Sequence, residues 1–291
     1  MEIETHAKCN RLCSFCPNVD RNRIFNDTTT NAAVLAQIFQ ELGEIDYRGQ
    51  LKVARYSEPL ANIPYLYEQL KLARELIPHG ELAIVTNTDY LNTAVLDSLS
   101  ELGLDVVYMS IYLPVRAKGW SLKNARTYTD RVEEKLGLRA LTNYEASRSV
   151  RRTYQHGRLR VQSACLDFSY ESTDRGGLLN DFMSERRLAP CWEPFSTFVV
   201  DYTGDVVPCC NVLSDKNEHR EFVVESLASS QSSIFDIYAD KLLGWRRSMM
   251  TFDEKDSPCT TCRHKDAEPQ DLPVLKKQFA ARRRALGDWP A

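Results

Sequence analysis

The first 165 residues alternate between two hydrophobic periods, one typical of buried strands and the other of amphipathic helices. Short runs rich in β-branched and apolar residues predict strands, and longer runs with apolar residues three or four positions apart predict helices. The predicted strands are residues 2–6, 51–56, 82–86, 106–113 and 159–165, and the predicted helices are residues 31–42, 65–76, 91–102 and 131–138. Strands that alternate with helices indicate a parallel sheet built from βα units.

This βα region predicts an α/β fold in the form of a partial barrel. A complete eight-unit TIM barrel takes about 250 residues, which is more than this region offers. Five or six units in an open, partial (β/α)6-type TIM barrel fit its length better. The active site of such a barrel would lie at the C-terminal ends of the strands.

The pattern changes after about residue 185, where strands and turns become mixed. Residues 195–201 and 205–208 alternate around Thr203-Gly204, which predicts a β-hairpin. A helical run follows at residues 234–249, and basic residues recur at helical spacing near the C-terminus. We therefore expect three parts, which are a partial barrel at residues 1–180, a small α+β domain at residues 181–270 and a C-terminal helix at residues 271–291.

Composition places the chain among globular proteins that work in water. Of its 291 residues, 43% are hydrophobic and 26% are charged. The formal net charge of −3 provides no overall field that would attract nucleic acid or an anionic membrane. Apolar runs are far shorter than a membrane span, and Glu2 and Glu4 stand where a secretory signal would need basic and then apolar residues. The expected location is cytoplasmic.

Three cysteines, Cys9, Cys13 and Cys16, follow the first predicted strand with the spacing Cys-X3-Cys-X2-Cys. Three thiolates can hold three irons of a four-iron four-sulfur cluster and leave the fourth iron open to a small-molecule ligand. The alternatives are a zinc site completed from elsewhere and part of a disulfide framework. Closed zinc sites usually present paired units, so the odd-numbered set favours the open cluster. Thiols that bind iron must stay reduced, which agrees with a cytoplasmic location.

A second set of cysteines lies in the C-terminal part of the chain. The predicted hairpin should bring Cys191 and Cys209 close together, and Cys259 and Cys262 form a Cys-X-X-Cys pair after the helical run. On spacing alone, structural zinc and an iron–sulfur cluster fit these four thiolates equally well. Cys210 directly follows Cys209 and cannot easily share its geometry, so it is left out of the ligand set.

The first cysteine motif, with aromatic Phe15 directly before Cys16, resembles the signature of the radical SAM superfamily. The second set resembles the twitch domain, a shortened SPASM extension that follows such barrels. Further similar segments are Glu58-Pro59-Leu60, the Arg175-Gly176-Gly177 turn, and the hairpin that ends in Val207-Pro208-Cys209. The resemblance implies S-adenosyl-L-methionine (SAM) and two 4Fe-4S clusters, one that binds SAM and one auxiliary. It also implies a flavodoxin- or ferredoxin-type electron donor.

The resemblance also points to residues at strand ends as SAM contacts. Ser57 stands where the family's Gly-Gly-Glu-like motif has glycine, and Thr88 replaces the glycine of a Thr-Asn-Gly turn. Taken singly, each of these positions fits an ordinary polar strand end better, and it is their order after the cysteine loop that favours SAM contacts. The expected contacts, in chain order after Phe15, are Tyr56, Ser57, Glu58, Thr86, Asn87 and Ser110.

In this family, SAM is cleaved to methionine and a 5′-deoxyadenosyl radical, which removes a hydrogen atom from the substrate. The reaction that we expect is oxidation of an alcohol to a ketone in a cyclitol, sugar or aminoglycoside-type substrate of antibiotic biosynthesis. The auxiliary cluster would accept the second electron, and Arg175 would hold the substrate oxygen or assist proton loss.

Three other readings stay open from sequence. A redox-neutral epimerase would use the thiol of Cys210 or Cys165 as hydrogen-atom donor, although either thiol also fits a buried apolar cysteine. A maturase that modifies ribosomal peptides and a cluster-binding scaffold without activity are the others. The basic run at residues 148–160 is expected to be a solvated loop, with a phosphate or carboxylate site as its alternative.

Overall fold

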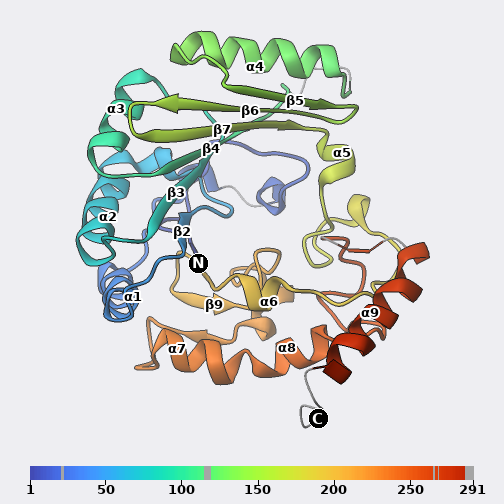
Figure 1. The fold of residues 1–291 in the computed structure, drawn as a ribbon. Coiled ribbons are helices and arrows are strands. Elements are labelled where there is room, and N and C mark those ends of the chain that lie inside the picture. The colour runs from blue at the N-terminus through green and yellow to red at the C-terminus, as the bar shows by residue number, and fades with distance from the viewer. Residues whose placement is uncertain (21–22, 115–118, 265, 268, 286–291) are drawn as a thin grey trace.

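The computed structural model describes residues 1–20, 23–114, 119–264, 266–267 and 269–285. Within these residues, the strands form one mixed sheet (Figure 1), in the order β10-β9-β8-β1-β2-β3-β4-β7-β6-β5. The strands are β1 Glu2–Ile3, β2 Gln50–Val53, β3 Glu81–Thr86, β4 Val106–Ile111, β5 Thr142–Ala146, β6 Ser149–His156, β7 Leu159–Leu166, β8 Val199–Val200, β9 Asp205–Val207 and β10 Glu225–Ser226.

Along the chain, the helices lie between these strands and after the last of them. The α-helices are α1 Ala32–Glu44, α2 Ile63–Leu76, α3 Thr93–Glu101, α4 Leu122–Leu136, α5 Phe168–Glu171, α6 Glu193–Ser196, α7 Ile234–Asp236, α8 Leu243–Met249 and α9 Leu272–Ala285. Short 3-10 helices span Pro17–Asp20, Arg23–Phe25, Pro59–Asn62, Asn180–Phe182, Asn217–Phe222 and Pro269–Asp271, and a π-helical turn spans Ile237–Lys241. No helix within the described ranges combines the length and hydrophobicity that crossing a membrane requires.

Six neighbouring strands, β8-β1-β2-β3-β4-β7, run parallel to one another. The predicted α/β partial barrel is therefore confirmed. Its sixth parallel strand is β8, which comes from the predicted C-terminal hairpin and pairs with β1. Strands β9 and β10 extend the same sheet in antiparallel fashion. The C-terminal part of the chain thus continues the barrel sheet directly.

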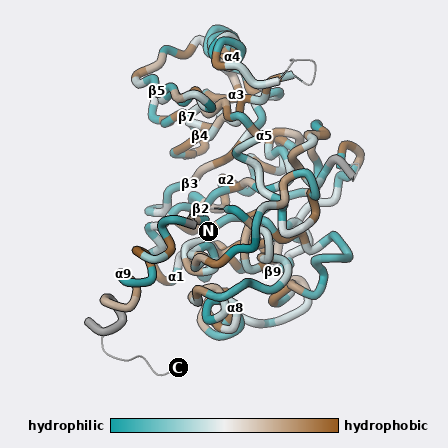
Figure 2. The backbone as a smooth tube through the Cα atoms, turned by 90° about the vertical axis from the view of Figure 1, so that its right-hand side faces the viewer, coloured by the Kyte–Doolittle hydropathy of each residue, from teal (hydrophilic) through white to brown (hydrophobic). Residues whose placement is uncertain are grey.

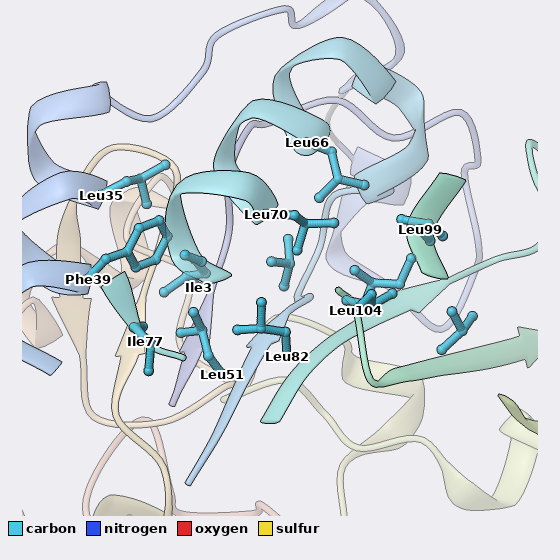
Figure 3. Close-up of a cluster of buried hydrophobic side chains, with 14 of the residues drawn as sticks. Ile3, Leu35, Phe39, Leu51, Leu66, Leu70, Ile77, Leu82, Leu99 and Leu104 are labelled. Atoms are coloured by element: carbon cyan, nitrogen blue, oxygen red, sulfur yellow. The ribbon is translucent and has the colours of Figure 1, made fainter. Parts of the chain in front are cut away.

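The two faces of the sheet differ in polarity because successive side chains along a strand point to opposite sides. Figure 2 shows the resulting interleaving of polar and apolar positions along the chain. On one face, Ile3, Leu51 and Leu82 pack against Leu35, Phe39, Leu66 and Leu70 of α1 and α2 (Figure 3). Helices α1, α2 and α3 cover this apolar face (left in Figure 1).

The opposite face of the sheet, which we call the barrel interior, is polar. Glu2 and Lys52 are register partners on β1 and β2, and their side chains form an ion pair of 2.6 Å. Gln50 Nε2 donates to the hydroxyl of Tyr108 at 3.0 Å. Charged and hydrogen-bonding groups on this face favour a hydrophilic ligand over an apolar one.

The basic run at residues 148–160 forms β6, a turn and the start of β7, so its prediction as a loop is wrong. The basic side chains are accommodated because acidic residues face them. Arg152 pairs with Asp130 at 2.8 Å and also with Glu133, both on α4, and Arg160 pairs with Glu81 at 2.5 Å. Arg152 of β6 therefore faces acidic residues of α4, and Arg160 of β7 faces an acidic residue of β3.

Candidate active site

The first cysteine set lies in the loop after β1, close to the C-terminal edge of the parallel strands. The backbone N–H of Cys9 donates to the carbonyl of Arg23 at 3.4 Å, and that of Cys16 to the carbonyl of Cys13 at 3.0 Å. Burial, reinforced by the neighbouring thiols, raises the pKa of Cys9 to about 11 and that of Cys13 to about 12. Three half-buried thiols with raised pKa values ionise readily only when a cation lies between them, which is the condition that bound iron provides.

The cysteine loop is fixed to the end of β3 by a polar network. Arg11 donates to Asp89 through Nε at 2.7 Å and Nη2 at 2.5 Å, and Asn10 Nδ2 donates to the same carboxylate at 2.7 Å. The side chain of Asn87 donates to Asn10 Oδ1 at 2.7 Å. Such two-pronged contacts order a loop well. Sequence reasoning named Asn87 but missed the other three residues, because they are ordinary loop residues until the fold brings them together.

A buried ion pair stabilises the base of the cysteine loop. Arg23 Nη1 donates to Glu4 Oε1 at 2.7 Å, and Arg23 Nη2 lies 3.3 Å from Asp215. Glu4 Oε1 also accepts the backbone N–H of Tyr56 at 3.1 Å. Arg23 and Glu4 are both almost fully buried, and burial raises the pKa of Glu4. The pair links β1, the cysteine loop and the end of β2.

Glu58 connects the ends of β2 and β3. Its carboxylate accepts Thr86 Oγ1 at 2.7 Å, the N–H of Asn87 at 2.6 Å and the N–H of Leu60 at 3.2 Å. Burial raises the pKa of Glu58 to about 6, against the opposing effect of these donors. Thr88 adopts a φ of +71°, the left-handed conformation that the expected glycine would favour. The Thr-Asn turn therefore forms in spite of the substitution, and Glu58 holds it.

Next to Glu58, two buried polar atoms offer a test of whether a SAM molecule fits here. Among the described residues, Ser57 Oγ and Asn18 Oδ1 are buried without a hydrogen-bond partner. Asn18 Nδ2 donates to the carbonyl of Tyr56 at 2.6 Å, which brings the segment after Cys16 against the end of β2. Unmatched buried acceptors are costly, so their place beside the cysteine loop fits a ligand with an ammonium or hydroxyl group. Asn18 was not recognised from sequence.

The two remaining expected SAM contacts lie on the other side of the loop. The ring of Phe15 stacks on Phe168 with 4.2 Å between centroids and also contacts Tyr112 at 5.3 Å. Ser110, half-buried on β4, hydrogen-bonds to Tyr112 and thereby partly offsets the rise in the Tyr112 pKa that burial causes. Phe15 and Ser110 thus both contact Tyr112.

The second cysteine set also converges. The thiols of Cys259 and Cys262 raise the pKa of Cys209, and the thiol of Cys191 raises the pKa of both Cys259 and Cys262. Burial is the largest cause, and the pKa values of Cys259 and Cys262 rise to about 12 and about 11. These four thiols come from three separate segments, and together they could ligate all four irons of a four-iron four-sulfur cluster.

Arg187 braces this second set and was not predicted. Its fully buried guanidinium donates to the carbonyls of Ala189 at 3.1 Å, Pro190 at 2.9 Å, Cys262 at 3.1 Å and His264 at 2.8 Å. One side chain therefore ties the segment before Cys191 to the segment around Cys262. A buried guanidinium that satisfies four carbonyls is a strong local constraint.

Arg175, Tyr56 and Cys210 lie between the two cysteine sets. The hydroxyl of Tyr56 donates to the carbonyl of Cys210 at 2.9 Å, and the guanidinium of Arg175 lies 5.8 Å from the centre of the Tyr56 ring. The charge of Arg175 lowers the pKa of Cys16 and of Cys210, against the larger effect of burial. Arg175 is thus within electrostatic reach of Cys16 in the first set and of Cys210, the neighbour of Cys209 in the second.

The thiol of Cys210 lies within 4.8 Å of a carboxylate oxygen of Glu193 and a ring nitrogen of His264. Burial raises its pKa to about 12, and the carboxylate of Glu2 acts in the same direction. Cys165 lies elsewhere, fully buried in an apolar cluster with Ile111, Ala125 and Val150. On β7, Cys165 alternates with Arg160 and Ala164, so its side chain points away from the interior. The structure therefore brings Cys210 into the candidate site and separates Cys165 from it.

Comparisons with known proteins agree with this arrangement. Residues 191–263 match the SPASM family, an iron–sulfur cluster-binding domain. The S-adenosyl-L-methionine-dependent 2-deoxy-scyllo-inosamine dehydrogenase of Niallia circulans is 24% identical over 223 residues, which are 74% of this chain and 75% of that enzyme. The FeMo cofactor biosynthesis protein NifB of Klebsiella pneumoniae is 28% identical over 117 residues, which are 38% of this chain and 25% of that protein.

The fold also has a counterpart among solved structures. The crystal structure of BtrN in complex with AdoMet and 2-DOIA superposes with a TM-score of 0.62 and 23% sequence identity, over 90% of this chain and 92% of that one. The predicted resemblance to radical SAM enzymes with a SPASM-type extension is therefore confirmed. The iron–sulfur character of the C-terminal part, which spacing alone left open against zinc, is supported by the SPASM match.

Proposed function

We propose that this protein is a radical SAM oxidoreductase that oxidises an alcohol of a hydrophilic ring substrate, of the cyclitol, sugar or aminoglycoside class, to a ketone. The observation that carries the proposal is the placement of Arg175 and Tyr56 between a three-thiol set and a four-thiol set. The three-thiol set matches an open cluster, and the four-thiol set matches a closed one. The similarity to a dehydrogenase of this cofactor type supports the reaction.

The candidate residues would form two separate cofactor sites. Cys9, Cys13 and Cys16 would hold the cluster that binds SAM, and the polar strand ends would position SAM itself. Within that site, Ser57 Oγ and Asn18 Oδ1 would accept hydrogen bonds from SAM, since neither atom has a partner among the residues that the structure describes. Glu58 fixes the turn after β3. The auxiliary cluster would take Cys191, Cys209, Cys259 and Cys262 as ligands.

When bound and reduced, SAM at the open cluster supplies a 5′-deoxyadenosyl radical that removes a hydrogen atom from a substrate C–H bond. The chain's own task is to hold the substrate carbon in reach and to stabilise its oxygen. Arg175 supplies a buried positive charge beside the site, and Glu2 and Lys52 supply polar contacts from the barrel interior. Loss of one further electron and one proton would then give the ketone, and an auxiliary cluster held by Cys191, Cys209, Cys259 and Cys262 could accept that electron. A flavodoxin- or ferredoxin-type protein would be the initial donor.

A second candidate function is redox-neutral epimerisation, and the position of Cys210 favours it. Its thiol lies within 4.8 Å of Glu193 and His264 and within electrostatic reach of Glu2, Arg175 and Lys52, close to where a substrate radical would form. Transfer of the thiol hydrogen atom to the opposite face of that radical would invert the carbon. The thiyl radical left behind would need one electron and one proton, and the neighbouring auxiliary cluster is the candidate source of the electron.

Anaerobic turnover in heavy water separates the two reactions. The assay contains cluster-loaded protein, SAM, dithionite and a panel of 2-deoxy-scyllo-inosamine, other cyclitols and aminoglycosides. Oxidation gives a product with two hydrogens fewer and no solvent deuterium at the reacting carbon, whereas epimerisation gives a product with one deuterium there. Product masses read by mass spectrometry decide between them. A panel in which no compound raises 5′-deoxyadenosine above the substrate-free level would contradict the proposed substrate class.

The thiol-donor reading has its own control. If the protein is a dehydrogenase, Cys210→Ala keeps product formation within about threefold of the unchanged protein, because the thiol takes no part. If it is an epimerase, Cys210→Ala stops inversion while 5′-deoxyadenosine still forms. Cys165→Ala is the matched control, since Cys165 lies on the opposite face of the sheet and its loss should leave either reaction intact.

A further inference from the structure

The loop that carries Arg175 has an unusual backbone. Arg175, Gly176 and Gly177 adopt φ angles of +51°, +68° and +86° in succession. The left-handed region is unfavourable for a residue with a Cβ atom, so Arg175 keeps this conformation only if its surroundings impose it. The contacts that impose it come from the segments that carry the second cysteine set.

The first contact runs through Asp174, which is fully buried. Its Oδ1 accepts the backbone N–H of Gly176 at 3.2 Å, which stabilises the turn itself. Its Oδ2 accepts the hydroxyl of Thr261 at 2.6 Å. Thr261 lies between Cys259 and Cys262, so one carboxylate joins the Arg175 turn to the Cys-X-X-Cys segment.

The second contact runs through Asn211, which is 3% exposed and follows Cys209 and Cys210. Asn211 Oδ1 accepts Arg175 Nη1 at 3.1 Å, so it orients the guanidinium directly. It also accepts Thr173 Oγ1 at 3.2 Å. From the same amide, Nδ2 lies 3.7 Å from the sulfur of Cys262, within reach of a donor contact to a thiolate.

The third contact closes over Gly176. His219 Nδ1 accepts the N–H of Leu213 at 3.0 Å, so its Nε2 carries the proton and donates to the carbonyl of Gly176 at 2.8 Å. A Cβ atom on Gly176 would lie 2.9 Å from the His219 ring and 3.0 Å from Pro258. Pro258 directly precedes Cys259. The glycine is therefore required by close packing against the cysteine segment.

We propose that the auxiliary-cluster segments build the substrate site, and that Thr261 and Asn211 act as positioning residues for Arg175. The inference rests on the proposed function and deepens it. Iron bound to Cys209, Cys259 and Cys262 fixes the segments that contribute Thr261 and Asn211, and these in turn hold the left-handed Arg175 turn. The auxiliary cluster thus shapes substrate binding whatever its part in electron transfer.

Hydrogen–deuterium exchange of residues 172–179 tests this in the cluster-loaded full chain. Thr261→Val removes the hydroxyl donor at constant shape, and we expect amide exchange in this peptide to rise about fivefold to tenfold, the effect of one lost hydrogen bond. Thr261→Ser should restore protection. Thr260→Val is the matched control, because Thr260 precedes it in the same segment and uses its backbone carbonyl to contact Arg187. Asp174→Asn weakens the same bond from the other side, in case Thr261→Val fails to load iron.

Steady-state kinetics provide a second test of the positioning role of Thr261. Thr261→Val should raise the KM of the best panel substrate about fivefold to tenfold and increase uncoupled 5′-deoxyadenosine, with iron still near eight per chain. Exchange and KM that stay at the unchanged protein's level in Thr261→Val or, if that variant loses iron, in Asp174→Asn would overturn the inference. If instead the proposed function is wrong, the unchanged protein itself should form no 5′-deoxyadenosine, and this result distinguishes the two failures.

Discussion

Cys13→Ala should abolish SAM cleavage and halve the iron content. With one of three thiolates gone, the open cluster loses a ligand that the buried loop cannot replace, so iron should fall from about eight to about four per chain. The formation of 5′-deoxyadenosine from SAM under dithionite should drop at least about a thousandfold, to the detection limit. Iron quantification and chromatography of 5′-deoxyadenosine measure both effects on the same anaerobic sample.

Cys165→Ala is the control for this variant. Its thiol packs among Ile111, Ala125 and Val150 and lies apart from both cysteine sets. We expect full iron content, unchanged SAM cleavage and a loss of about 1 kcal/mol in the free energy of unfolding from the small cavity. Full SAM cleavage by Cys13→Ala, or an equal loss of iron in both variants, would contradict the assignment of Cys9, Cys13 and Cys16.

Arg175→Gln should separate radical formation from turnover. The substitution removes the buried charge between the two sets and leaves all seven proposed cluster ligands in place. We expect iron near eight per chain and persistent substrate-free 5′-deoxyadenosine, but product formation reduced by about a hundredfold, the scale of a lost charged contact to a reacting oxygen. The ratio of 5′-deoxyadenosine to product, measured by mass spectrometry, reports the uncoupling.

Two further variants make this prediction specific. Arg175→Lys keeps the charge but loses the planar fork that Asn211 and the substrate would share, so its turnover should lie between those of Arg175→Gln and the unchanged protein. Arg148→Gln is the control at the surface, where the guanidinium lies 3.5 Å from the centre of the Tyr170 ring. Product formation by Arg175→Gln at the level of Arg148→Gln would show that Arg175 is structural only.

Much of the fold could be predicted because the βα region has clear periodicity. The apolar runs around Leu82 and Leu159 became parallel strands with nearly the expected bounds, whereas the strand predicted at residues 51–56 ends already at Val53. The β5–β6 hairpin was missed because its stabilisation is not local. Arg152 on β6 is paired by Asp130 and Glu133 of α4, and a basic run shows no such partners when read alone. The predicted division at residues 180 and 270 stays a proposal, although β8 pairs with β1 across the first boundary.

The candidate site was predictable where a motif spacing carried the chemistry. Three close cysteines and a Cys-X-X-Cys pair are visible in any reading of the chain. By contrast, Asn18, Arg187 and Asn211 act through contacts with residues far away in sequence, such as the 75 positions that separate Arg187 from Cys262. The choice between Cys165 and Cys210 also needed the structure, because only the register of β7 shows to which face Cys165 points.

We propose that the three-thiol loop and the neighbouring strand ends hold a cluster that cleaves SAM. The most direct measurement is anaerobic incubation of the iron-loaded, unchanged protein with SAM and dithionite, followed by quantification of methionine and 5′-deoxyadenosine. We expect both products in equal amounts, from protein that carries about eight irons and no stoichiometric zinc. Intact SAM after incubation with fully iron-loaded protein, or zinc in place of iron at the cysteines, would contradict it.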